Sequence, residues 1–156
     1  MLPHTHFVLT LVPTVTYVVL RDKQIPSLRF VAVVFIGSQF PDLVDKPLAH
    51  QFGILPSGRV FMHSLPTALP VMLLVAFYGW QTDRARLAGA FVFSHLFHLL
   101  ADSYQAFVSN DSQIPSDLLW PLTPPIARPV IPPWAGPGGT NIELWTVFSA
   151  TVLSAL

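Results

Sequence analysis

Residues 60–80 read VFMHSLPTALPVMLLVAFYGW, a block that contains no Asp, Glu, Lys or Arg. A helix that crosses the hydrocarbon core of a bilayer needs about 20 apolar residues, with roughly 17 as the lower limit. This block reaches that length without help from its neighbours. It therefore predicts a membrane-spanning helix and indicates an α-helical membrane protein.

Four more apolar blocks lie on either side of this one, separated by short polar loops. They cover residues 7–20, 30–36, 87–101 and 142–156. A proline-dense segment at about 118–140 precedes the last block. We therefore expect an all-α integral membrane bundle of four to five helices, a single domain over residues 1–156 with a Pro-rich loop before the last helix.

Composition favours the membrane over a soluble helical bundle. Hydrophobic residues make up 52% of the chain and charged residues only 10%, against about 25% charged in a typical soluble domain. A soluble bundle with so few charges would have little polar surface. Basic and acidic residues balance at eight each, so no basic excess indicates a nucleic-acid partner. The absence of cysteine excludes disulfides, thiolate zinc sites and thiol nucleophiles.

Ionisable side chains in so apolar a chain are candidates for function, because charge is costly in a bilayer. The strongest group is His95, His98 and Asp102. Offsets of three, four and seven residues place all three on one helix face, and imidazole nitrogen and carboxylate oxygen are ordinary zinc ligands. A His–Asp hydrogen bond between buried groups is the structural alternative. Two His and one Asp exceed what one such bond requires, which favours a metal site.

A second group is the pair Asp42 and Asp45 in GSQFPDLVD, residues 37–45. Pro41 disfavours helix for the residue before it, so we expect these carboxylates to project from a turn or a new helix start. Capping of a helix N-terminus by one of them is the alternative.

Alternation of the helices brings these groups together. Four crossings place five basic residues at one end of the bundle and three at the other, a small positive-inside excess. The same alternation gathers the candidate ligands at one end: His4, His6, Asp42, Asp45, His63, His98 and Asp102. A lone histidine such as His63 is also compatible with a satisfied core residue, and His4 and His6 with tail residues. A set of this size could hold two or three metal ions, each lowering the pKa of a water toward about 7.

Four motifs occur in order: Gly-x-x-x-Pro-Asp-x-x-Asp at 37–45, Arg-x-x-x-His-Ser at 59–64, His-x-x-x-Asp at 98–102 and Leu-Leu-Trp-Pro-Leu at 118–122. Over residues 4–122 the chain resembles the YdjM-like family of membrane-bound metal-dependent hydrolases. Residues 41–48, together with 55–59 and His63-Ser64, look closest to archaeal, particularly haloarchaeal, members. The family is similar to zinc-dependent phospholipase C, an all-helical phosphoesterase.

The resemblance implies Asp42 or Asp45, His63, His98 and Asp102 as metal ligands, with an N-terminal His as a further one. Many members carry a His before the Arg of the second motif, where this chain has Gly58. A later His-x-x-x-Glu pattern is also missing. These departures favour one or two metal ions over three.

We therefore expect a multi-pass protein of a prokaryotic, archaeal cell membrane that hydrolyses a phosphoester, a lipid headgroup or a nucleotide, with zinc as cofactor. Asp45 would bind metal or act as general base, and Arg59 would pair with a phosphate oxygen. Membrane lipids would surround the protein, and its protein partners are not indicated. The alternative is a non-catalytic scaffold or transporter-like bundle in which the His/Asp cluster is structural.

Overall fold

The computed structural model describes residues 3–108 and 116–125, with the side chains of 7–103 and 116–125. Its elements are α1 (Pro3–Asp22), α2 (Leu28–His50), α3 (Leu65–Gln81), α4 (Ala85–Val108) and the short 3-10 helix η1 (Ser116–Leu119). These ranges contain no strand, so the expected all-α class is confirmed for them. The expected last helix at 142–156, and the Pro-rich segment beyond residue 125, lie outside the described residues.

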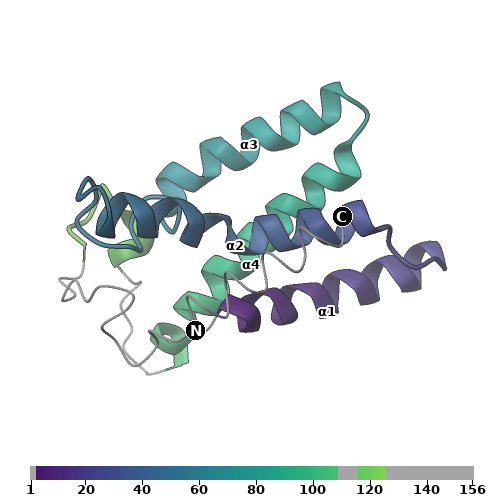
Figure 1. Ribbon diagram of the computed structural model, residues 1–156, viewed down its shortest axis with the longest axis horizontal. Helices are drawn as coiled ribbons and strands as arrows, with labels where there is room; N and C mark the ends of the chain where they lie inside the picture. The colour runs from purple at the N-terminus through teal and green to yellow at the C-terminus, as the bar shows by residue number, and fades with distance from the viewer. Residues whose placement is uncertain (1–2, 109–115, 126–156) are drawn as a thin grey trace.

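The helices form two antiparallel hairpins, α1–α2 and α3–α4, which pack through α2 and α4 (Figure 1). Both hairpin turns lie at one end of the bundle, and the segment between α2 and α3 lies with η1 at the other. Gly37 allows the central contact to be close, because a Cβ there would lie 2.7 Å from the backbone oxygen of Phe91. Val34 and Ala90 belong to the buried apolar cluster at this contact.

Helix α2 differs from its sequence-based prediction. It runs through Pro41 and Pro47 to His50. The sequence predicted that Asp42 and Asp45 project from a turn or a new helix start, but both lie inside this continuous helix. Proline removes one backbone donor and disfavours helix for its predecessor. Pro41 is fully buried in this packed helix, and burial against the rest of the bundle outweighs that local preference.

The block at 60–80 is divided between a loop and a helix. Ser64 is the N-cap residue of α3, with proline in the first turn, and residues 60–64 belong to the preceding loop. Helix α3 is consequently 17 residues long.

None of the described helices combines the length and the apolar content needed to cross a membrane. The expected membrane crossings are therefore not confirmed.

Candidate metal centre

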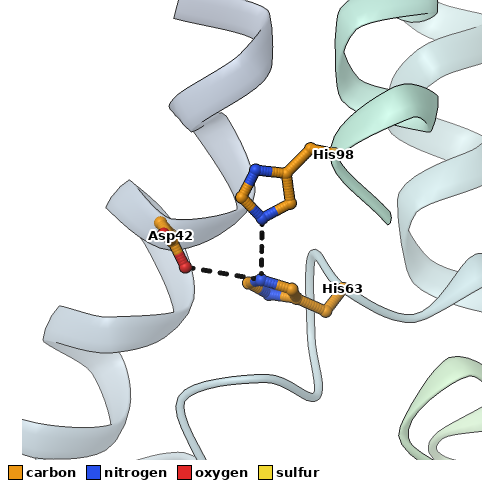
Figure 2. Close-up of side chains that lie close together, drawn as sticks. All are labelled: Asp42, His63 and His98. Carbon is orange, nitrogen blue, oxygen red and sulfur yellow. Dashed lines mark hydrogen bonds and ion pairs between the residues drawn. The ribbon is translucent and has the colours of Figure 1, made fainter. Parts of the chain in front are cut away.

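Side chains from three separate parts of the chain meet at the end of the bundle opposite the hairpin turns. Figure 2 shows Asp42 from α2, His63 from the loop before α3 and His98 from α4 pointing toward one another. One ligand atom from each lies within 4.8 Å of the other two. The Nε2 atom of His63 is 3.4 Å from Oδ1 of Asp42 and 3.2 Å from Nε2 of His98. Asp42 is 9% exposed, and both histidines are more deeply buried.

Hydrogen bonds on the far side of each imidazole ring determine which nitrogen faces this centre. Nδ1 of His63 lies 2.8 Å from Oδ2 of Asp45, and Nδ1 of His98 lies 2.6 Å from the backbone oxygen of Ser38. A carboxylate and a carbonyl can only accept, so both Nδ1 atoms carry the proton. The two Nε2 atoms then present lone pairs to each other at 3.2 Å. Two lone pairs at this distance repel unless a cation, either a proton or a metal ion, lies between them.

Two of the three ligand–ligand distances match those of a tetrahedral metal site, and the third lies within 4.8 Å. Bonds of about 2.0–2.1 Å to nitrogen and oxygen place neighbouring tetrahedral ligand atoms about 3.3 Å apart. The two distances from His63 Nε2, 3.2 and 3.4 Å, bracket that value. A fourth atom is close, since Oδ2 of Asp102 lies 3.7 Å from His63 Nε2 and 3.9 Å from His98 Nε2. The donor set of two imidazoles and one or two carboxylates suits a zinc-type ion.

Asp45 lies behind His63 and contacts it from the side away from the centre. Its Oδ1 accepts from the backbone N–H of Met62 at 2.7 Å, and its Oδ2 accepts from the backbone N–H and Nδ1 of His63 at 3.3 and 2.8 Å. Asp45 is fully buried. In this position it orients the imidazole and sets its tautomer, the role that second-layer carboxylates have at metal sites.

His95 is also placed behind the loop that carries His63. Its Nε2 lies 2.9 Å from the backbone oxygen of Met62 and donates to it, and its ring packs between those of Phe40 and Phe91. The backbone of Met62 is thus held at both its N–H and its C=O. His95 does not belong to the group of converging ligand atoms, although it shares a helix with His98.

Two cationic side chains flank the carboxylates of the centre. Lys46 Nζ is 2.7 Å from Oδ2 of Asp42, and Arg59 Nη2 is 3.2 Å from Oδ2 of Asp102. Arg59 therefore pairs with a carboxylate here, where the sequence predicted a phosphate. We did not single out Lys46 from the sequence, although its i,i+4 spacing from Asp42 was the available signal.

The surrounding charges explain the direction in which the pKa of His63 is shifted. Three carboxylates, those of Asp42, Asp45 and Asp102, face the two cations, which leaves one net negative charge with neutral histidines. Burial lowers the pKa of His63, but its hydrogen bonds to Asp42 and Asp45 outweigh burial and raise that pKa above the ordinary value.

The prediction that His4 and His6 are metal ligands is not tested by the structure. Both fall in the first turn of α1, but their side chains lie outside the described part of the chain.

The described residues thus form an all-α fold with a buried His/Asp group that could hold a metal ion. The family model of the YdjM inner membrane protein matches residues 1–156, and the chain belongs to that family. No curated protein and no solved structure matches the chain. The membrane setting expected from composition agrees with the family, whereas the haloarchaeal subgroup and the likeness to phospholipase C find no support.

Proposed function

We propose that this protein binds a divalent metal ion through Asp42, His63 and His98 and uses it to hydrolyse a phosphoester at the membrane. The observation that carries the proposal is the 3.2 Å separation of the two Nε2 atoms, each with its Nδ1 already committed to an acceptor. Zinc is the ion that this donor set suits best.

The residues of the chain prepare this site for an ion. Asp45 and the carbonyl of Ser38 fix the two imidazole rings, so little reorganisation is required on binding. A small shift of Asp102 from Arg59 toward the two Nε2 atoms would add a fourth ligand. The ion would supply Lewis acidity, lowering the pKa of a water and polarising a phosphoryl oxygen.

Charge points to an anionic substrate. With neutral histidines the centre has one net negative charge, and a bound divalent ion would bring it to one net positive charge. If Asp102 turns to the ion, Arg59 is released to pair with a phosphate oxygen, the role that the sequence predicted for it. Both an anionic lipid headgroup and a nucleotide satisfy this requirement. Asp45 then acts through His63, because both its oxygens are occupied.

Metal analysis of the purified full-length protein tests the first part of the proposal. We expect about one equivalent of tightly bound transition metal, lost in His98→Ala. His50→Ala, which removes a histidine outside the ligand group, should keep the metal and serves as the matched control. Metal content below about 0.3 equivalent that does not change in His98→Ala would contradict metal binding.

Hydrolysis of bis(p-nitrophenyl) phosphate by the metal-loaded protein tests the second part. We expect turnover that is lost in His98→Ala and retained in His50→Ala. If the protein binds metal stoichiometrically but hydrolyses neither this ester nor a phospholipid, the proposed metal site stands and the proposed catalytic role is wrong.

The second candidate is a non-catalytic membrane protein with a structural His/Asp cluster. The ion pairs Lys46–Asp42 and Arg59–Asp102 favour it, because they compensate the carboxylates without a metal ion. This alternative predicts that Asp102→Asn and His63→Ala impair folding. Variants that fold normally but lose metal or turnover would exclude it.

A further inference from the structure

A groove runs between α1, α2 and α4 at the end of the bundle that carries the hairpin turns. Its volume is about 710 Å³, within the range of about 300–1,000 Å³ that small-molecule sites occupy. Apolar side chains form most of its wall, among them Pro13, Val18, Phe30 and Phe93. Phe30 precedes Asp42 by 12 residues on α2, a distance of about 18 Å along a helix. None of the residues that line the groove belongs to the candidate metal centre, so the two sites are separate.

Charged side chains gather at one end of this groove. Arg86 Nη2 lies 2.6 Å from Oδ2 of Asp22, and Arg21 Nε lies 3.8 Å from its Oδ1. The two arginine side chains are 58% and 67% exposed, so each has N–H groups that face solvent. One carboxylate against two guanidinium groups leaves a single positive charge, which is complementary to one negative charge on a ligand.

We propose that this groove binds a phospholipid with a single negative charge. Its phosphodiester pairs with Arg21 and Arg86, and an acyl chain lies along the apolar wall toward Pro13 and Phe93. A free phosphate ion would meet the charges but leave the apolar wall uncovered. The family's membrane setting supplies such lipids. The proposal does not depend on the metal centre or on catalysis.

Gly89 on α4 gives direct experimental access to the groove. It belongs to the wall, and a Cβ built on it would meet no atom within 4 Å. By contrast, a Cβ on Gly79 would lie 2.3 Å from the Cβ of Ala88. A larger side chain at position 89 would therefore begin in open space at the groove wall, without a clash at its Cβ.

The test uses the full-length protein in lipid nanodiscs with a photoactivatable phosphatidylglycerol, and mass spectrometry locates the labelled peptides. We expect label on α1 and α4 at the groove wall. Gly89→Leu should reduce that labelling about tenfold, whereas the matched variant Gly89→Ala should largely retain it. Arg21→Gln combined with Arg86→Gln should also reduce it about tenfold, since hydrogen bonds to charged groups contribute at that level. Arg84→Gln removes an arginine outside the wall and should have little effect.

Three results would overturn the proposal. Equal labelling by a photoactivatable phosphatidylcholine, which has no net charge, would remove the charge argument. Unchanged labelling in Gly89→Leu would place the lipid elsewhere. The chain has no cysteine, so Gly89→Cys provides a unique thiol for a photo-crosslinker. If that crosslinker captures another segment of the protein's own chain in place of lipid, the groove is an internal contact.

Discussion

The two ends of the bundle differ in how far their ionisable side chains are exposed to solvent. At the metal centre the side chains of Asp45, His63 and His98 are at most 5% exposed, and each is held by hydrogen bonds. At the hairpin turns, Arg21 and Arg86 are more than half exposed around Asp22. Buried polar groups must be paired or they cost free energy, so their geometry is fixed by the fold. Exposed pairs contribute little and can exchange a protein partner for a ligand.

The largest effect that tests this contrast should come from Asp45→Ala. The substitution removes the acceptor for the backbone N–H of Met62 and for two N–H groups of His63. We expect the free energy of unfolding to fall by about 3–5 kcal/mol, because one partner of a buried charged network is lost. Denaturant unfolding of the metal-free protein measures it. A loss below about 1 kcal/mol would show that the burial of this network does not determine the stability of this end.

Metal affinity should show the next effect. Asp42→Asn replaces the carboxylate of a proposed ligand with an uncharged amide, and we expect the dissociation constant for Zn²⁺ to rise at least about a hundredfold, above the 10–100-fold range of second-layer changes. Competition titration with a chelating dye measures the constant. Asp22→Asn, the corresponding change at the opposite end of the bundle, is the control and should leave it unchanged.

A smaller effect than these two should be the pH dependence of the stability of the metal-free protein. The pKa of His63 is raised in the folded state, so the stabilisation from its charged form is complete below the unfolded value of about 6.5. That stabilisation is lost as the pH rises through the folded pKa. Unfolding measured between pH 5 and pH 9 should show this decline, and His63→Gln should reduce it. An equal decline in the variant would assign the titration to another group.

The smallest effect should be that of Arg86→Gln on stability. Its ion pair with Asp22 is short but its side chain is 58% exposed, and such pairs contribute between 0 and about 1 kcal/mol. We expect the midpoint of thermal unfolding to move by no more than a few degrees. A loss comparable to that of Asp45→Ala would show that the exposed end is as constrained as the buried one.

The sequence predicted the helical class and located the polar groups within it. It missed the extent of α2, because the local effect of Pro41 gave no measure of the burial that holds the helix together. It also placed residues 60–64 in a helix, although Ser64 caps α3 and leaves His63 in a loop. The roles of individual metal ligands stay predictions, and the structure brings Asp42, His63 and His98 closest together.

The sequence by itself determined what depends on spacing along one helix. The expected shared face of His95, His98 and Asp102 follows from their offsets and 3.6 residues per turn, and the scarcity of charge made each ionisable group a candidate. Only the tertiary structure decided which of the two histidines on α4 faces the candidate metal centre. His98 lies against His63, whereas His95 donates to the backbone oxygen of Met62. These contacts join residues 33 and 35 positions apart. Such contacts depend on how helices pack, which no local pattern specifies.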